Sequence, residues 1–214
     1  MKSLLEKCPV GVDQNIGYKI FEAEWFGNDY GSLENRKRMV VVALSEGIDA
    51  DIDLSAVPSL LSKPKSFAEI ADDIPLDDAM WCKYDYIVEK EKRSKKKGDG
   101  YRIRAYSYSS DSICTVTKGH WKVRISDPFI EHPTKPAYMR KLTTREQARV
   151  KSIPDQLAEG FFSIATQEIF GQSVCYGKFL SLSAHLGRVF KEFVDSVHDH
   201  HYLSHNRVKD SFVL

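Results

Sequence analysis

Residues 140–155, RKLTTREQARVKSIPD, form the stretch of sequence from which the fold can be inferred. Thr143 and Glu146 have the spacing of a capping box, in which the hydroxyl and the carboxylate satisfy free amides at the start of a helix. Pro154 cannot continue a helix because it has no amide proton. The stretch therefore predicts a short helix that begins after Thr143 and ends at or shortly before Pro154.

Before this stretch, residues 16–45 predict two strands around a turn. Ile16–Phe21 begins the first strand, glycines interrupt Gly27–Gly31, and Met39–Leu44 is a continuous apolar run. Such a run suits a strand covered on both faces, as in the centre of an α/β sheet. We expect this strand to lie inside a sheet.

Residues 46–139 have a different character. Three prolines interrupt the acidic first part. In Tyr101–Arg104 and Trp121–Ile125, aromatic or aliphatic residues alternate with bases, which predicts strands with one buried face and one cationic face. Lys97–Gly100 is a candidate turn between such strands.

The C-terminal part predicts one long amphipathic helix. Its apolar residues recur at steps of three or four, which places them on one face: Cys175, Phe179, Leu182, Leu186, Val189, Phe193 and Val197. From His198 onward we expect a polar, frayed tail. His201 and His205 have the i,i+4 spacing of a metal pair, but the segment lacks cysteine, and an exposed tail without metal is the preferred interpretation.

The net charge of +1 conceals a strong asymmetry. Residues 42–80 contain nine acids and two lysines, whereas residues 81–124 contain twelve bases and five acids. A concentrated basic segment suits contact with phosphates, because each neutralised phosphate releases counterions. The run KRSKKK taken alone also suits a solvated surface loop.

Composition excludes several classes of protein. With 214 residues and 42% hydrophobic residues, the chain can form one sizeable core or two small ones. It has no apolar run of about 18 residues, so no membrane span is expected, and the N-terminus is too short and charged for a signal peptide. The four cysteines have no paired spacing, which suits free thiols in a reducing cytoplasm.

Three blocks in this order resemble the last motifs of the cytosine-5 DNA methyltransferases. Tyr30–Arg38 (YGSLENRKR), with Gly17-Tyr18 upstream, is similar to the eighth motif, Gln-x-Arg-x-Arg before an apolar strand. Arg140–Asp155 resembles the ninth motif, and Ile169–Val174 (IFGQSV) resembles the tenth. Between the first two, Ser112–Thr117 (SICTVT) looks like the family's Thr-Leu element, with valine in place of leucine.

The resemblance implies roles for particular residues. Arg38 would hydrogen-bond the flipped cytosine, for which a guanidinium offers fixed donors, and Arg36 would order the active site. Thr115 would lie against the DNA backbone beside the flipped nucleotide. The segment Gly171, Gln172, Ser173 and Val174 would contact S-adenosylmethionine. We expect the remaining DNA contacts from Lys95, Lys96, Lys97, Arg102, Arg104, Lys118, Lys122 and Arg140, although Arg140 and Arg145 belong to a motif that mostly organises the recognition domain.

Other family features are missing. The sequence has no Phe-x-Gly-x-Gly cofactor loop, no Glu-Asn-Val and no Pro-Cys, the dipeptide that presents the nucleophilic thiolate; Cys8-Pro9 has the reverse order. Covalent catalysis needs both a thiolate and a proton donor, so the chain alone should not methylate. Glu34 replaces the eighth-motif glutamine, so that an intramolecular salt bridge could replace a substrate contact, and Gln172 replaces the tenth-motif asparagine. Cys175 is expected in the core, and Cys82 and Cys114 are expected to be small fillers.

The resemblance predicts an α/β fold: the C-terminal part of a Rossmann-like methyltransferase sheet and a small, mostly β target-recognition domain. Residues 1–45 would complete the sheet, 46–139 would read DNA, 140–197 would form the ninth- and tenth-motif helices, and 198–214 would be the tail. The implied function is the DNA-recognition subunit of a split methyltransferase of a restriction-modification system, cytoplasmic and encoded by a bacterium or phage. Its partners would be double-stranded DNA and a catalytic subunit, with which it would share S-adenosylmethionine. Met1 would then be a translation start downstream of the missing motifs. The alternatives are an inactive DNA-binding remnant or regulator and, least supported, a scaffold without nucleic acid.

Overall fold

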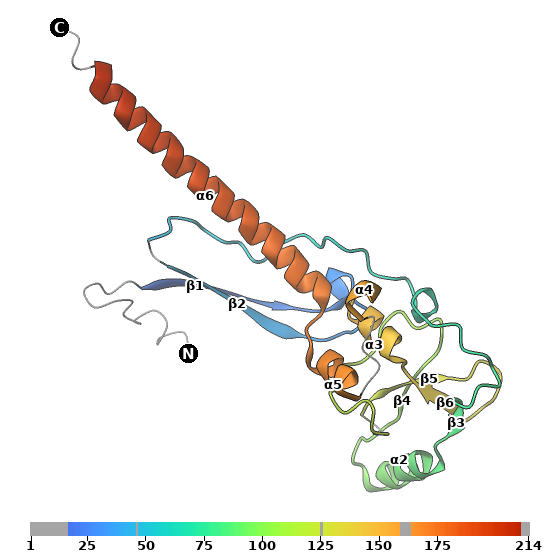
Figure 1. Ribbon diagram of the computed structural model, residues 1–214. Coiled ribbons are helices and arrows are strands. Elements are labelled where there is room, and N and C mark those ends of the chain that lie inside the picture. The colour runs from blue at the N-terminus through green and yellow to red at the C-terminus, as the bar shows by residue number, and fades with distance from the viewer. Residues whose placement is uncertain (1–16, 46, 125, 159–163, 211–214) are drawn as a thin grey trace. The chain divides into compact units, whose positions relative to one another are not determined.

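The structure is a computed structural model that describes residues 17–45, 47–124, 126–158 and 164–210 (Figure 1). The chain divides into two units that are each discontinuous in sequence. Among the described residues, the hairpin unit comprises 17–24, 39–45, 47–58 and 181–210, and the sheet unit comprises 25–38, 59–124, 126–158 and 164–180. These units interleave along the chain.

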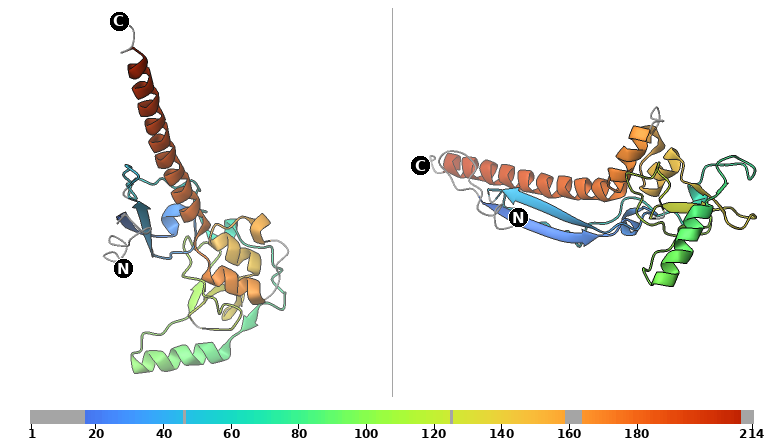
Figure 2. Two further views of the ribbon diagram at one scale, coloured as in Figure 1. Left: turned by 60° about the vertical axis from the view of Figure 1, so that its left-hand side comes forward. Right: turned by 90° about the horizontal axis from the view of Figure 1, so that it is seen from below.

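The hairpin unit contains most of a two-stranded sheet, β1 (Tyr18–Trp25) paired with β2 (Arg38–Ser45), which lie side by side in Figure 2. β2 confirms the strand expected over Met39–Leu44. The expectation that it is covered on both faces is wrong for the described residues, because Met39 is 66% exposed and Val41 is 37% exposed. β2 pairs only with β1 among the described strands.

The long C-terminal helix is confirmed as α6 (Tyr176–Asp210). The frayed tail expected from His198 onward is wrong for the backbone, since the helix continues to Asp210. The side chains of His201 and His205 lie outside the described residues, and the described residues contain no cluster of three metal-ligating groups. None of the described helices combines the length and apolar character needed to cross a membrane.

The sheet unit is built on a mixed four-stranded sheet with the order β3-β6-β5-β4. Its strands are β3 (Cys82–Lys83), β4 (Arg104–Tyr106), β5 (Pro128–Glu131) and β6 (Tyr138–Lys141). β5 is antiparallel to β6 and parallel to β4. A strand is expected over Tyr101–Arg104. The observed strand, β4, shares only Arg104 with this range. No strand covers 121–124, because the backbone closes two turns there, with His120 N donating to Thr117 O and Lys122 N to Gly119 O.

The basic run is a helix, α2 (Asp85–Lys97), rather than a surface loop. Lysine and glutamate are good helix formers, and Lys95 lies one turn after Glu91, with the charged atoms 3.7 Å apart. The last three lysines also face the negative end of the helix dipole. Gly98 ends the helix with a φ of 75°, so the expected turn at Lys97–Gly100 is a helix terminus instead of a link between strands.

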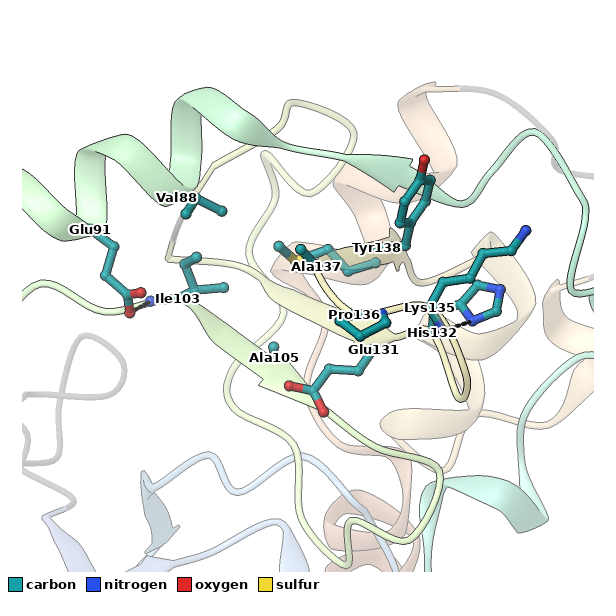
Figure 3. Close-up of a pocket in the computed structure, with 11 residues that line it drawn as sticks. Val88, Glu91, Ile103, Ala105, Glu131, His132, Lys135, Pro136, Ala137 and Tyr138 are labelled. Atoms are coloured by element: carbon teal, nitrogen blue, oxygen red, sulfur yellow. Dashed lines mark hydrogen bonds between the residues drawn. The ribbon is translucent and has the colours of Figure 1, made fainter.

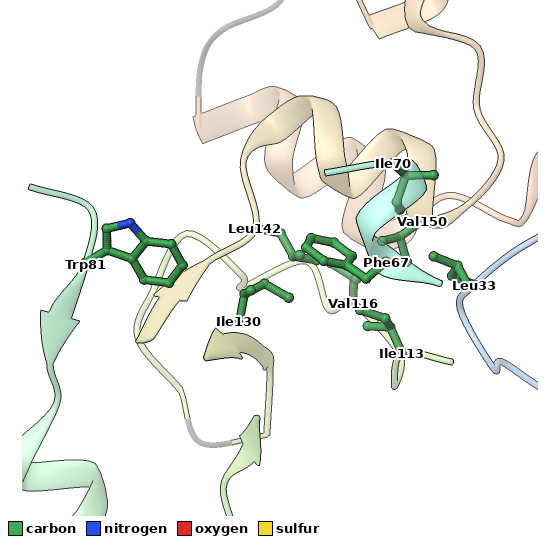
Figure 4. Close-up of a cluster of buried hydrophobic side chains, with 9 residues drawn as sticks. All are labelled: Leu33, Phe67, Ile70, Trp81, Ile113, Val116, Ile130, Leu142 and Val150. Carbon is green, nitrogen blue, oxygen red and sulfur yellow. The ribbon is translucent and has the colours of Figure 1, made fainter. Parts of the chain in front are cut away.

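Three short helices follow the sheet: α3 (Thr144–Val150), α4 (Asp155–Ala158) and α5 (Ile164–Gln172). The predicted capping box is confirmed, with the Thr143 hydroxyl accepting from Glu146 N and the Glu146 carboxylate accepting from Thr143 N. Nine buried side chains form the core of this unit (Figure 4): Leu33, Phe67, Ile70, Trp81, Ile113, Val116, Ile130, Leu142 and Val150. The first two motif blocks and the Thr-Leu segment all contribute to this core.

Candidate functional site

The Tyr30–Arg38 block and the Ser112–Thr117 segment run alongside each other. Ile113 N donates to Leu33 O at 2.8 Å, and Asn35 N donates to Ile113 O at 2.9 Å, which forms a parallel bridge around Glu34. Glu34 N donates to Val150 O at 3.0 Å. These backbone bonds bring the first block, the Thr-Leu segment and the end of α3 to one place.

A buried ion pair lies at this meeting point. The Lys151 ammonium donates to the two Glu34 carboxylate oxygens at 2.8 and 2.7 Å, and both side chains are fully buried. Glu34 Oε1 also accepts from Val116 N at 2.8 Å, and Oε2 lies 3.4 Å from the Cys175 thiol. The charge that replaces the motif glutamine is thus balanced by Lys151, not by the neighbouring arginines.

The same pair contacts the third block. Lys151 Nζ lies 3.5 Å from Ser173 O, and Tyr176 N donates to Lys151 O at 2.9 Å. Arg36 donates to Ser173 O at 3.3 Å. All three motif blocks therefore meet within one hydrogen-bonded network. The motif order predicted their association, but no feature of the sequence singled out Lys151.

The two predicted catalytic arginines have different surroundings. Arg36 is half-buried, and its Nε is buried without a hydrogen-bond partner among the described residues. Lys178 Nζ donates to the carbonyl oxygens of Trp25 and Arg36 at 2.7 and 2.8 Å, and burial lowers the pKa of this ammonium. Arg38 is exposed, and its guanidinium donates to the adjacent Lys37 carbonyl.

The second block is organised by a second buried ion pair. Arg140 donates to both Glu146 oxygens at 2.6 and 2.7 Å, and neither side chain is exposed. Arg140 therefore cannot contact DNA from this position, and its inclusion among the DNA-binding residues was wrong. Arg149 bonds Asp155 and Asp72, and this hydrogen bonding lowers the pKa of the Asp155 carboxyl. The block thus connects α3 to the segment around Asp72 and to the start of α4.

Comparison with known proteins identifies the family to which this arrangement belongs. A profile of the C-5 cytosine-specific DNA methylases matches residues 14–178. The chain is a member of this family.

Two curated relatives are type II methyltransferases. M.NlaX of Neisseria lactamica is 27% identical over 167 residues, which cover 76% of this chain and 50% of that protein. M1.ScrFI of Lactococcus lactis subsp. cremoris is 22% identical over 166 residues, which cover 75% of this chain and 41% of that protein. The chain thus spans about half the length, or less, of these curated relatives.

Solved structures support the methyltransferase fold. The S. pombe Dnmt2 methyltransferase matches with a TM-score of 0.61 at 16% identity, covering 78% of this chain and 56% of that one. The Entamoeba histolytica methyltransferase EhMeth matches with a TM-score of 0.58 at 16% identity, covering 79% and 53%. The family resemblance and the α/β class inferred from sequence are confirmed.

C-5 cytosine-specific methylases use S-adenosylmethionine, and two residues of the segment predicted to contact it are open to solvent. Gln172 and Val174 are exposed and can contact a ligand. The Ser173 hydroxyl donates to Phe170 O at 2.8 Å. Gly171 is buried, and a Cβ there would collide with backbone atoms of Thr117 and Lys118, so this glycine serves packing.

The residues predicted to contact DNA are mostly exposed. Thr115 is half-buried and lies between Ile113 and Val116, both of which the first block fixes. The exposed cations are Lys95, Lys96, Lys97, Arg102, Arg104, Lys118 and Lys122. Only Arg140 is withdrawn from this group by burial.

Three cysteines fall among the described residues. Cys175 is 2% exposed, which confirms its expected core position, and burial raises the pKa of its thiol. Burial also raises the pKa of Cys114. Cys82 is exposed, so its interpretation as a filler was wrong, and Cys8 lies outside the described residues. Neither Cys114 nor Cys175 occupies a site that favours the thiolate a nucleophile needs.

Sequence reasoning missed two titratable side chains beside the sheet: His120, which is fully buried, and Lys141 at the end of β6, which is half-buried. Burial lowers the pKa of His120 to about 3, and burial lowers that of Lys141 to about 8. His120 Nε2 accepts from Leu142 N, whereas its buried Nδ1 has no partner among the described residues. Both side chains line a pocket of about 640 Å³ beside Trp121 and Arg145. A lone histidine in a basic segment gave no signal of this environment.

A second pocket, of about 520 Å³, lies between α2, β4 and the loop joining β5 to β6 (Figure 3). The Glu91 carboxylate accepts from Ile103 N at 2.8 Å at one end, and the His132 ring accepts the amides of Thr134 and Lys135 at the other. None of the residues predicted to act on DNA or cofactor lines this pocket.

Proposed function

We propose that this chain is the DNA-recognition subunit of a split DNA (cytosine-5) methyltransferase. The observation that carries the proposal is the meeting of three family motif blocks around the Glu34–Lys151 pair, in a sequence with no Pro-Cys, Phe-x-Gly-x-Gly or Glu-Asn-Val. The chain would supply DNA contacts and part of the cofactor wall. A partner polypeptide would supply the nucleophile and the cofactor loop.

The arginine pair supports a role at the reacting base. Because Lys151 neutralises Glu34, neither Arg36 nor Arg38 is used as its ion-pair partner. Arg38 is exposed and can present its guanidinium to a cytosine carbonyl. The buried Nε of Arg36, which has no hydrogen-bond partner among the described residues, is a donor that a substrate or a partner residue could satisfy.

The cofactor would bind between the two polypeptides. Gln172 and Val174 would hold one side of it, with an amide and an aliphatic surface. When bound, S-adenosylmethionine supplies the methyl group that is transferred. Lys151 and Arg36 would act indirectly here, because both contact the Ser173 carbonyl and so fix the path of the segment.

The exposed cations would hold the DNA. The predicted recognition domain, residues 46–139, contains the helix α2, whose C-terminal lysines 95–97 are exposed, and the exposed Arg102 and Arg104 beside it. Phosphate contacts of this kind position the duplex, whereas base contacts specify its sequence. Thr115 would contact the backbone beside the extruded nucleotide.

The partner would cover apolar surface on the hairpin unit. Met39 and Val41 of β2 are exposed, and Phe190, Val194 and Val197 recur along α6 at steps of four and three with exposures between 37% and 50%. Exposed apolar residues that recur on one helical face are typical of an interaction surface. The missing part of the methyltransferase is the proposed occupant.

A reconstitution experiment tests this function. The chain is mixed with a polypeptide that carries the three missing motifs, and transfer of labelled methyl groups from S-adenosylmethionine to DNA is measured. We expect transfer by the mixture and none by the chain alone. Arg38→Ala should abolish transfer while DNA affinity changes little, and Arg38→Lys, which keeps the charge without the planar fork, should not restore it.

Two outcomes would count against the proposal. If the mixture binds DNA but stays inactive on every DNA tested, the alternative of an inactive DNA-binding remnant is supported; the glutamine at position 172, where the family has asparagine, favours that reading. If Arg38→Ala weakens DNA binding as much as it weakens transfer, the assignment of Arg38 to the base is wrong.

A further inference from the structure

We propose that Glu34 and Lys151 are positioning residues, whose ion pair couples the Ile113–Thr117 segment to the Ser173 segment. The inference rests on the proposed function, because it takes the first segment as a DNA contact and the second as a cofactor contact. Neither Glu34 nor Lys151 would touch a ligand, since both are fully buried.

The carboxylate of Glu34 is shared between two structural tasks. Its Oε1 accepts from Val116 N and from Lys151 Nζ, both at 2.8 Å. Its Oε2 accepts from Lys151 Nζ at 2.7 Å and lies 3.4 Å from the Cys175 thiol. One carboxylate therefore fixes Val116 on one side and the residues around Cys175 on the other.

A glutamine cannot perform both tasks beside Lys151. Its single carbonyl oxygen could accept from Val116 N, but its amide NH₂ would then face the Lys151 ammonium and the Cys175 thiol, which are donors. The ammonium would also lose its counter-charge in a fully buried place, which is costly. Position 34 and position 151 are therefore interdependent: a glutamate at one requires a cation at the other.

Glu34 is the member of the pair that determines where Thr115 lies, because its carboxylate accepts from Val116 N. Ile113 is held by two backbone bonds to Leu33 and Asn35, and Val116 is held by Glu34. Thr115 has these anchors on both sides. Any shift of the Glu34 carboxylate would reach Thr115 through one residue, so Glu34 sets the placement of a predicted DNA contact without touching DNA.

Lys151 connects Glu34 to the third block through two contacts. Its ammonium reaches Ser173 O at 3.5 Å, and its own carbonyl accepts Tyr176 N. Arg36 donates to the same Ser173 carbonyl. The predicted cofactor segment and the predicted DNA segment thus both contact the same pair of side chains, Glu34 and Lys151.

Two charge-free double variants separate the tasks. Glu34→Gln with Lys151→Met keeps an acceptor for Val116 N, whereas Glu34→Leu with Lys151→Met has similar volume and charge but no acceptor. Replacing a buried ion pair by neutral residues of similar size is often tolerated by the fold. The two variants therefore differ chiefly in the Val116 hydrogen bond.

The readouts are amide exchange by segment and affinity for a duplex DNA, measured by fluorescence anisotropy. In the Gln/Met variant we expect exchange over 113–118 and DNA affinity within about twofold of the unmodified chain, and faster exchange over 172–176. In the Leu/Met variant, exchange over 113–118 should rise about tenfold, as expected for one lost hydrogen bond, and DNA affinity should fall.

Three results would decide the matter. Equal DNA affinity and equal exchange over 113–118 in the two double variants would overturn the positioning role. If the Leu/Met variant does not fold, Glu34→Asp serves instead, because its shorter carboxylate cannot reach both Val116 and Lys151; unchanged exchange over 113–118 in Glu34→Asp would again overturn it. If the unmodified chain binds no duplex DNA, the proposed function fails, whereas amide exchange still tests the coupling.

Discussion

Lysine and arginine occupy two contrasting environments in the sheet unit. Arg140, Lys151 and Lys178 are at most 3% exposed, and each is held by a carboxylate or by backbone carbonyls. The cations of α2 and of the residues before β4, by contrast, are exposed, and several take part in no ion pair among the described residues. The same residue types thus build the fold in one region and remain available for a polyanion in the other.

This difference shows that the number of cations in a motif does not measure its contact with DNA. A buried charge persists only where a counter-charge or several acceptors compensate its lost hydration. An exposed lysine needs no such partner and contributes little to stability. The ninth-motif block of this member of the C-5 cytosine-specific DNA methylase family contains both classes: Arg140 and Lys151 are fully buried, whereas Arg145 is exposed.

The largest effect is expected at the Arg140–Glu146 pair. Glu146→Gln leaves the buried Arg140 guanidinium without its counter-charge, and should lower the free energy of unfolding by about 3–5 kcal/mol. Urea denaturation measures this change. Glu131→Gln, at an exposed position, is the control and should change it by less than about 0.5 kcal/mol. Equal effects would remove the distinction between the two environments.

His120 sharpens the comparison, because it is a fully buried base that forms no ion pair with the described residues. Because burial lowers its pKa to about 3 in the folded state, against 6.5 for an unperturbed histidine, the unfolded chain binds the proton more readily. The stability that the folded protein gains from keeping His120 neutral is fully present above pH 6.5 and is lost as the pH falls toward 3. Between neutral pH and pH 5 we expect a loss of about 2 kcal/mol.

Comparison with His120→Gln isolates this contribution, because glutamine can still accept from Leu142 N without titrating. The difference in unfolding free energy between the two proteins, followed from pH 7.5 to 5 by urea denaturation, should decrease by the amount just given. A difference that stays constant across this range would mean that His120 is not kept neutral by the fold.

Replacing exposed cations should change DNA affinity and leave stability nearly unchanged. Replacing Lys95, Lys96 and Lys97 by methionine should leave the unfolding free energy within about 0.5 kcal/mol. DNA affinity should fall, and the slope of its logarithm against the logarithm of salt concentration should decrease by about 0.9 for each lost phosphate contact. Titrations at several salt concentrations measure this slope. An unchanged slope would exclude the end of α2 from the DNA contact.

The smallest effect is expected at an exposed ion pair of the hairpin unit. Lys19 Nζ lies 3.4 Å from Asp49 Oδ1, and the Asp49 side chain is fully exposed. Asp49→Asn should leave the midpoint of urea unfolding nearly unchanged, because solvent screens an ion pair at this exposure. A large loss there would show that exposure alone does not separate the two classes of cation.

The features predicted successfully from sequence were local ones. The Thr143–Glu146 capping box and the α6 helix depend on spacings of a few residues, and the motif order placed the chain in its family. Glu34 and Lys151 are 117 residues apart, and no local pattern connects them. Alternation predicts a strand over Trp121–Ile125, but residues 121–124 form no strand, and hydrogen bonds from His120 N and Lys122 N close two backbone turns at the start of this range. The burial of Arg140 depends on a partner six residues away whose role as a cap was recognised, while its role as a counter-charge was not.

If residues 46–139 read DNA, as we propose, Gly171 has a practical consequence for engineering a new DNA specificity. A Cβ at this position would collide with backbone atoms of Thr117 and Lys118. The backbone at residues 117–118 therefore has to keep its present position against the third block. A recognition segment transplanted from another methyltransferase should therefore end before Ile113 on one side and resume after Lys118 on the other. Residues 113–118 would then stay with the recipient as a fixed junction, and the parts around them would be the exchangeable cassette.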